Sequence, residues 1–278
     1  MRQAILRMCL LSLFTICTST FQATAAGLVP DKNLEAAIRA TIHDAKNAPL
    51  TDMDLKNVYV LEAPGKTIKD LTGLEKCTNL MQLKLTKNQI SDLKPLKELA
   101  SIQSLDLADN KISDVTPLAG LTKLQYLELS NNQITKVDAL KGLTAMSALY
   151  LSGNKITDIS PLGNLTKLSS LYLDRNHISD LTPLAKVTKL SSLDLRENQV
   201  SDLKPLEKQT ELRYLLLDKN KVTDLGPLVK SVKADADGEK RFAPYLFLYV
   251  TGNPLSDKAK SKQLEALKSY GVRINQQP

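Results

Sequence analysis

Apolar and polar residues recur along the chain in a pattern that repeats every 22 residues. In the segment LQYLELSNNQITKVDAL (residues 124–140), apolar and polar residues alternate through Leu127 and Leu129. Alternation at period two predicts a short β-strand with one buried face. A segment such as Asp-Leu-Thr-Pro-Leu (residues 180–184) then predicts a turn that enters one tight helical turn. Proline fits there because the first residues of a helix do not need their N–H groups for the helix itself.

An asparagine occupies the same place in each of seven successive units. The seven are Asn88, Asn110, Asn132, Asn154, Asn176, Asn198 and Asn220. The chain must bend after each strand, and the bend leaves backbone donors and acceptors facing the core. A side-chain amide supplies two donors and one acceptor oxygen, whereas an unpaired buried partner costs roughly 1–3 kcal/mol. We therefore interpret this column as a structural ladder and not as a functional site.

The columns follow the leucine-rich repeat pattern L-x-x-L-x-L-x-x-N-x-L. The chain resembles the bacterial internalin-type, 22-residue class of leucine-rich repeat proteins, which is shared with a eukaryotic regulator of type 1 protein phosphatase. The resemblance rests on NNQITKVDAL, GNKITDISPL and RNHISDLTPL in the array, on VPDKNLEAAIRATI and IKDLTGLEKCTNL at its start, and on VTGNPLSDKAKSKQLEALKSYGV at its end. It covers about residues 29–275. Together with the repeat, it predicts an α/β solenoid, a right-handed horseshoe with a parallel concave sheet, convex loops and 3-10 turns, and helical caps at both ends.

The repeats divide the chain into four predicted parts. These are an export signal peptide (1–26), an N-terminal helical cap (27–57), a solenoid of about nine repeats (58–255) with a polar insertion near 231–244, and a C-terminal helical cap (256–278). Asp31 is predicted to begin a cap helix, Thr51 and Asp54 to form a capping box, and Ser256 to open a helix that Gly271 ends. Such caps cover the apolar ends of an open stack.

The N-terminal residues are typical of an export signal, with Arg2 and Arg7, an apolar run, and small residues at 23–25. No later apolar stretch is long enough to span a bilayer, so we expect an exported protein, periplasmic or secreted. Lipid attachment at Cys17 is the less favoured alternative. Cleavage would lower the formal net charge from +7 to +5 and leave Cys77 as the only cysteine. We interpret Cys77 as a small buried apolar residue.

No pattern of catalytic residues emerges from the sequence. The two histidines, His43 and His177, fall on different elements, and no HExxH, GxSxG, phosphate-binding glycine loop or CxxC pair is present. Residues 235–238 (Asp-Ala-Asp-Gly) resemble the start of a calcium loop but lack the remaining ligands, and we interpret them as a solvated loop. We expect no catalytic residue, no metal and no cofactor.

An aspartate follows most of the asparagine positions by four residues, with Lys136 as the exception. The column comprises Asp70, Asp92, Asp114, Asp158, Asp180, Asp202, Asp224 and Asp257. A stripe of acids could bind a metal or a basic partner. Each carboxylate could instead cap the helical turn that follows, by accepting local N–H groups. Capping is the favoured interpretation because Ser or Thr, which suits such turns, precedes most of these aspartates.

Residues that point out of the strands vary from repeat to repeat, and tyrosines and charges gather there. The predicted partner-binding residues are Asp106, Tyr126, Glu128, Tyr150, Tyr172, Arg175, Asp194 and Arg196. Tyrosine beside charge is typical of recognition surfaces, because a ring adds contact area at little entropic cost. The structural alternative is that strands accept tyrosine for its propensity alone. All of these side chains are predicted to point out of the strands, and those of Tyr150 and Tyr172 to face solvent.

These features predict an exported, non-enzymatic module that binds a protein or peptide on its concave sheet. We expect a monomer that binds no nucleic acid. Two alternatives stay open. An intracellular scaffold similar to the phosphatase regulator is disfavoured by the export signal. A binder of an anionic surface polymer would use the net positive charge, but the lysines are spread over several columns, as is usual for a solvated face.

Overall fold

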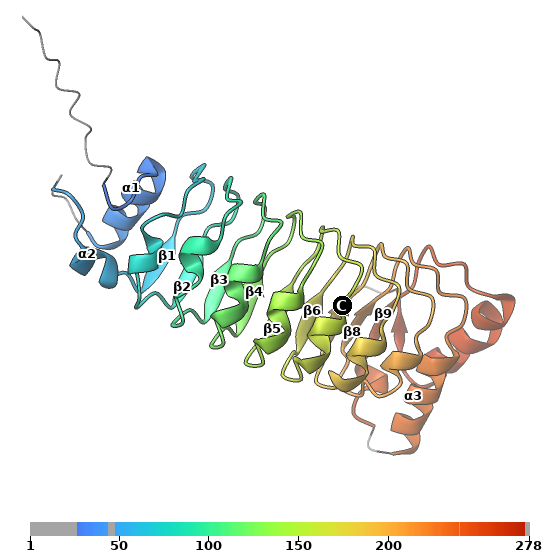
Figure 1. The fold of residues 1–278 in the computed structure, drawn as a ribbon. Coiled ribbons are helices and arrows are strands. Elements are labelled where there is room, and N and C mark those ends of the chain that lie inside the picture. The colour runs from blue at the N-terminus through green and yellow to red at the C-terminus, as the bar shows by residue number, and fades with distance from the viewer. Residues whose placement is uncertain (1–26, 44–47, 239, 276–278) are drawn as a thin grey trace, which may run out of the picture.

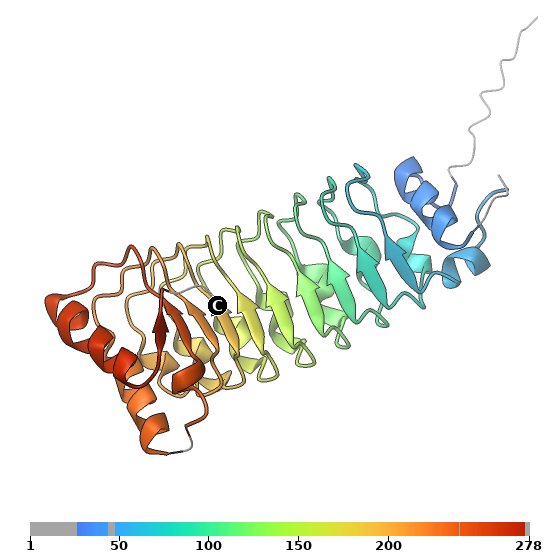
Figure 2. The same ribbon diagram turned by 180° about the vertical axis from the view of Figure 1, so that it is seen from behind.

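The computed structural model describes residues 27–43, 48–238 and 240–275, so the predicted signal peptide lies outside the described residues. Ten strands within these ranges form one sheet, with the strands in sequence order and every neighbouring pair parallel. Figures 1 and 2 show the strands stacked side by side along one curved array. The strands are β1 (Val60–Glu62), β2 (Gln82–Lys84), β3 (Ser104–Asp106), β4 (Tyr126–Glu128), β5 (Ala148–Tyr150), β6 (Ser170–Tyr172), β7 (Ser192–Asp194), β8 (Tyr214–Leu216), β9 (Phe247–Tyr249) and β10 (Arg273–Ile274).

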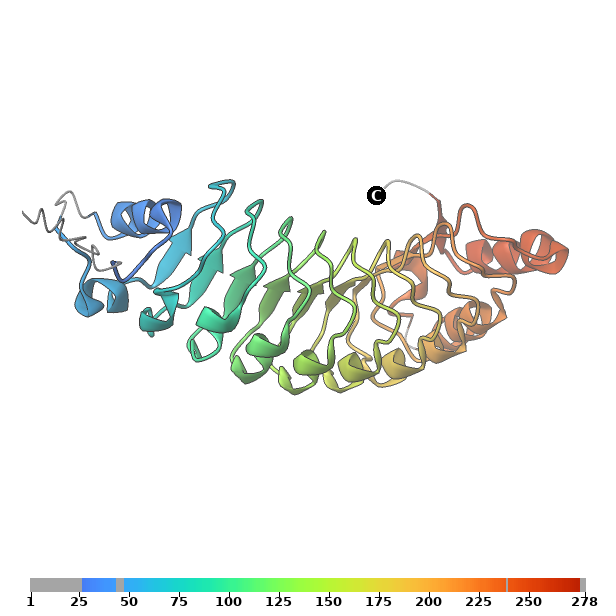
Figure 3. The same cartoon turned by 45° about the horizontal axis from the view of Figure 1, so that its top comes forward.

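Short 3-10 turns line the side of the array opposite the sheet, as Figure 3 shows. They are η1 (Leu74–Lys76), η2 (Lys94–Leu96), η3 (Thr116–Gly120), η4 (Asp138–Gly142), η5 (Ser160–Asn164), η6 (Thr182–Lys186), η7 (Lys204–Leu206) and η8 (Ala243–Tyr245). The predicted solenoid, with a parallel sheet on one side and tight turns on the other, is confirmed.

The acidic column lies where the chain enters these turns. Asp114 Oδ1 accepts the backbone N–H of Thr116, the first residue of η3, at 2.8 Å. Equivalent bonds of 2.8–2.9 Å reach Asp92, Asp158, Asp180 and Asp202. These bonds favour the capping interpretation over a metal or partner site.

The leucine columns and the asparagines together fill the space between strands and turns. Leu127 and the leucines of the same column in β1 to β9 have no exposed surface. Asn132 Nδ2 donates to the carbonyl oxygens of Leu129 and Leu107, both at 3.0 Å, and its Oδ1 accepts from the N–H of Ile112 at 2.9 Å. Each of the seven amides joins its own bend to the preceding repeat in this way.

The N-terminal cap consists of α1 (Lys32–Thr41) and α2 (Asp52–Lys56), and the capping box at Thr51 and Asp54 is present. Asp31 caps α1 by accepting the N–H groups of Asn33 and Leu34. Its second oxygen accepts N–H groups from Lys69 and Asp70 in the first repeat, at 2.8 and 3.2 Å. One carboxylate therefore joins the cap to the array.

The C-terminal end differs from the prediction in two respects. The region expected to be a polar insertion contains α3 (Gly226–Asp237), which buries Leu228 and Val232 and takes the place of a 3-10 turn. Beyond the nine predicted repeats, π-helical residues Ala259–Gln263 and α4 (Leu264–Ser269) lead into β10, which pairs with β9. The extra strand gives β9 a hydrogen-bonding partner on its outer edge.

The interpretation of residues 235–238 as a solvated loop is wrong. Asp235 is 8% exposed, and its carboxylate accepts the backbone N–H groups of Arg241, Phe242 and Ala243 at 2.9, 3.1 and 2.9 Å. The aspartate therefore fixes the reversal of the chain after α3. In the part of the chain that the structure describes, no helix is both long and apolar enough to cross a membrane.

Candidate binding surface

Three tyrosines form a continuous aromatic group at the centre of the concave sheet. Tyr150 and Tyr172 are register neighbours on β5 and β6, and their rings stack with centroids 4.8 Å apart and planes 24° apart. Tyr126 on β4 lies against Tyr150 at a centroid distance of 5.4 Å. Adjacent strands lie about 4.8 Å apart, which matches the stacking distance of aromatic rings. We call these three residues the tyrosine stack.

The tyrosine stack is partly buried and not free in solvent, in contrast to the expectation from sequence. Burial and the charges of Glu128 and Asp106 together raise the pKa of the Tyr126 hydroxyl to about 12. The Tyr126 hydroxyl therefore stays protonated at neutral pH, and the stack offers ring surface together with hydrogen-bonding groups.

Asp106 and Glu128 lie beside the tyrosine stack on its N-terminal side, and we call them the acidic pair. They are register neighbours on β3 and β4. Asp106 accepts the N–H of Ala108 at 3.2 Å, and Glu128 accepts that of Ser130 at 2.7 Å. Among the described residues, no cation lies within the 4.0 Å ion-pair distance of either carboxylate. Burial raises the pKa of Glu128, and the charge of Asp106 adds to the increase.

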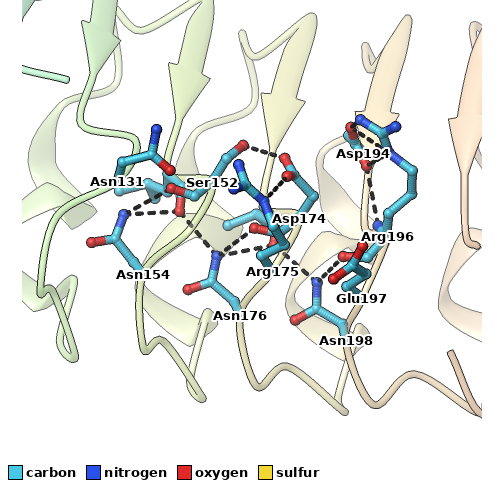
Figure 4. A network of polar contacts seen from close by, with 12 residues as sticks. Asn131, Ser152, Asn154, Asp174, Arg175, Asn176, Asp194, Arg196, Glu197 and Asn198 are labelled. Atoms are coloured by element: carbon cyan, nitrogen blue, oxygen red, sulfur yellow. Dashed lines mark hydrogen bonds and ion pairs between the residues drawn. The ribbon is translucent and has the colours of Figure 1, made fainter. Parts of the chain in front are cut away.

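The C-terminal side of the stack carries acids that are paired with arginine, as Figure 4 shows. Arg196 Nε lies 3.0 Å from both carboxylate oxygens of Asp194, and its Nη2 lies 2.5 Å from Oδ2. Arg175 Nε donates to Asp174 Oδ2 at 2.9 Å, while Ser152 Oγ donates to Asp174 Oδ1. The guanidinium groups lie outside the carboxylates, and we call Arg175 and Arg196 the arginine pair.

Asp194 occupies an outward strand position but does not face solvent. The residue has no exposed surface although it points outward from β7, because it is covered and bonded by Arg196. Burial raises the pKa of the Asp194 carboxyl, and the hydrogen bonds from Arg196 lower it in part. Asp174 lies at an outward position in the sequence but is not among the predicted partner-binding residues. It is 8% exposed and holds Arg175 through one bond to Nε.

A second aromatic group lies at the C-terminal end, at outward strand positions that are not among the predicted partner-binding residues. Tyr214 and Phe247 stack with centroids 5.3 Å apart, and the guanidinium of Arg273 lies 4.8 Å from the Phe247 ring centroid. Beside them Arg213 lies 4.5 Å from the ring centroid of Tyr245. Phe247 is 33 residues after Tyr214, and the two are register neighbours on β9 and β8.

The structure gives little support for a nucleophilic cysteine or a metal site. Burial raises the pKa of Cys77 to about 12, so its thiol stays protonated at neutral pH and is a poor nucleophile. Over the described ranges, no three His, Cys, Asp or Glu side chains come together as metal ligands would. The concave face, with its tyrosine stack between the acidic pair and the arginine pair, is the candidate site.

Comparison with known proteins identifies the class to which the chain belongs. The family model described as Leucine Rich repeats (2 copies) matches residues 100–142 and 147–186, and the model described as Leucine Rich repeat matches 76–93. No protein with a curated description matches the chain. The fold, the repeats and these matches define a leucine-rich repeat protein.

Solved structures give the family. Internalin C2 from Listeria monocytogenes is 37% identical, with 72% of this chain and 89% of that chain covered and a TM-score of 0.71. An internalin (inlF) from the same species is 29% identical, with 91% and 78% covered and a TM-score of 0.78. The chain belongs to the internalin family of bacterial leucine-rich repeat proteins. The leucine-rich repeat ectodomain of the Arabidopsis thaliana receptor kinase GASSHO1/SCHENGEN3, solved with CASPARIAN STRIP INTEGRITY FACTOR 2, is 22% identical, with 68% and 26% covered and a TM-score of 0.57. That likeness shows the fold alone.

Proposed function

We propose that this protein is an exported, non-enzymatic module that binds a protein or peptide partner on its concave sheet. The observation that carries the proposal is the tyrosine stack at the centre of the sheet, in which the partly exposed rings of Tyr150 and Tyr172 stack and the ring of Tyr126 lies tilted against Tyr150. Rings that are already ordered lose little conformational entropy when a partner covers them. A preorganised aromatic surface rimmed by charge is the arrangement found at protein-binding hot spots.

The size of the surface suits a peptide segment or one face of a helix. From β3 to β7 the sheet advances by four strand spacings, or about 19 Å. Within this distance the tyrosine stack would supply most of the affinity, and the charged groups beside it would set orientation and association rate. The mixture of charges in this region favours a protein partner over a uniformly anionic polymer, which would meet the acidic pair unfavourably.

The proposal is tested by photo-crosslinking with the intact protein. A crosslinking amino acid is placed at Ser170, which neighbours Tyr172 on β6, and in a matched variant at Lys141, which is exposed on the convex turn η4. We expect discrete crosslinked products in envelope or host extracts from the concave position only, and their loss when Tyr150→Ala and Tyr172→Ala are added. Products formed equally from Lys141, or insensitive to the tyrosine substitutions, would show that the concave face is not the binding surface.

A further inference from the structure

We infer that the concave face recognises the charge order of its partner. A cationic side chain would lie over the acidic pair, an aromatic or apolar side chain over the tyrosine stack, and a carboxylate over the arginine pair. This inference rests on the proposed function and adds to it the chemistry and the direction of the bound segment. It arises from a contrast between two groups of acids on the same face, one without and one with cationic partners.

At the N-terminal side the acids are open to an external cation. Lys84 is the register neighbour of Asp106, yet among the described residues no nitrogen of a Lys, Arg or His lies within 4.0 Å of the Asp106 carboxylate. A hollow of about 200 Å³ opens at this point, lined by Gln82, Ser104, Asp106 and Tyr126 together with Lys84. Its carboxylate and ring suit the head group of an arginine or lysine, since a cation gains from both an acid and an aromatic face.

At the C-terminal side most acids are already paired with a cation. Asp194 is covered by Arg196, and Asp174 is bonded by Arg175 and Ser152. Glu197 pairs with Lys219 at 3.0 Å. Asp218 is the exception, because it accepts the N–H of Thr251 at 2.7 Å and has no Lys, Arg or His nitrogen within 4.0 Å among the described residues. A partner that approaches this side therefore meets two partly exposed guanidinium groups.

Burial of Asp194 serves to position Arg196. The register neighbour of Asp194 on β8 is Leu216, so the fold accepts an apolar side chain in this column. A buried carboxylate is costly to desolvate, and its bonds here fix the Nε and Nη2 side of the guanidinium. Nη1 of Arg196 and both terminal nitrogens of Arg175 donate to no acceptor among the described residues, and the two side chains are 45% and 51% exposed.

Arg175 and Arg196 lie next to each other on consecutive repeats. The backbone N–H of Arg175 donates to the carbonyl oxygen of Arg196 at 2.8 Å, which puts the residues side by side on consecutive repeats. Planar guanidinium groups with free terminal N–H groups match the two oxygens of a carboxylate. The distance of about 19 Å across the face corresponds to about six residues of extended peptide at roughly 3.3 Å per residue.

The test selects displayed random 12-residue peptides against the purified protein and measures their affinities individually. We expect enriched sequences to place a basic residue and an acidic residue about six positions apart, on opposite sides of an aromatic or large apolar residue. Arg175→Gln with Arg196→Gln should weaken these peptides at least about tenfold, as should replacement of the peptide's acid by its amide. The two changes combined should weaken binding little more than either alone.

The outcomes separate this inference from the proposed function. The control, Lys141→Gln with Lys186→Gln on convex turns, should leave affinity unchanged. Peptides that need Tyr150 and Tyr172 but show no acidic enrichment, or that bind the arginine variant within about twofold, would overturn the charge order and leave the proposed function standing. If no enriched peptide depends on the tyrosines, both ideas fail. Tight binding of heparin that is lost in the arginine variant, without such peptides, would assign the arginine pair to an anionic polymer and overturn the inference.

Discussion

The carboxylate of Asp194 lies fully buried beneath the guanidinium of Arg196, two residues further along the same chain. Arg196 contacts both carboxylate oxygens, and its backbone N–H also donates to Asp194 Oδ1 at 3.1 Å. The two side chains therefore satisfy each other locally, although Asp194 occupies an outward-facing strand position. Its acid contributes to the surface only through the arginine that it holds.

The first prediction concerns this pair. Arg196→Ala should lower the free energy of unfolding by about 1 kcal/mol, because the carboxylate loses its charge-assisted hydrogen bonds while removal of the covering side chain returns it in part to water. Adding Asp194→Leu should recover most of the loss, since the neighbouring strand carries Leu216 in this column. Urea denaturation of the two variants measures both effects. The matched control, Arg175→Ala, should cost less, because Asp174 keeps its bond from Ser152. A double variant less stable than Arg196→Ala alone would contradict this account.

The second prediction concerns the tyrosine stack. Tyr150→Ala with Tyr172→Ala should weaken binding of a partner by at least about 2 kcal/mol. Because the rings are partly buried and stacked, we also expect the free energy of unfolding to fall, with about 0.5–1.5 kcal/mol from the stacking itself. Calorimetric titration and thermal melting separate the two effects. Phenylalanine at both positions should retain the stack, so a Phe variant that loses all affinity would shift the binding role from the rings to the hydroxyls.

The third prediction tests the asparagine ladder with a neighbouring control. Asn132→Ala should destabilise the protein by at least roughly 1–3 kcal/mol, since it leaves the buried carbonyls of Leu107 and Leu129 and the N–H of Ile112 without this amide. Asn131 is exposed, its Nδ2 donates to Asp109 Oδ1, and its backbone is left-handed with φ 56°. Asn131→Lys should change stability by less than about 0.5 kcal/mol, because Lys87 has the same left-handed backbone in this column, with φ 58°. Equal losses at the two positions would show that the ladder amide has no special role.

The fourth prediction concerns acid stability. Burial raises the pKa of the Asp31 carboxyl, but the backbone N–H groups of Lys69, Leu34, Asp70 and Asn33 lower it more, so the net pKa is below its ordinary value. The stabilisation is therefore present above the ordinary pKa of about 3.9 and is lost as pH falls through the lower folded-state pKa. Asp31→Ala should reduce the melting temperature at pH 6 and reduce it much less at pH 2. An equal reduction at both pH values would mean that the carboxylate charge contributes nothing.

The fifth prediction concerns export. The basic start, apolar run and small residues at 23–25 predict removal of about the first 25 residues, so the natural protein should begin near Ala26 or Gly27. N-terminal sequencing of protein recovered outside the cytoplasm checks the position. Recovery of the chain with Met1 intact from the cytoplasm would favour the intracellular scaffold instead.

The solenoid, the strand register and the positions of the asparagine ladder could all be predicted from the 22-residue period. A period of 22 residues places each column in the same environment in every repeat, so one physical interpretation of Asn132 applies to all seven asparagines. The caps at Asp31 and Thr51 could be predicted for a related reason, because capping depends on residues within one turn of the helix. Features that depend on the repeat period or on short-range hydrogen bonds could therefore be predicted from the sequence.

The pairing of the outward side chains, in contrast, could not be predicted from the repeat and became clear from the folded chain. Asp106 and Asp194 occupy the same column, yet one carboxylate has no cation partner among the described residues and the other is buried under Arg196. The difference depends on the neighbouring side chain two residues on, Ala108 in one repeat and Arg196 in the other, and on the rotamer that brings the guanidinium back over the strand. Side-chain pairing across a sheet follows local packing and not the backbone repeat, so the period that specifies the fold leaves the chemistry of the face undetermined.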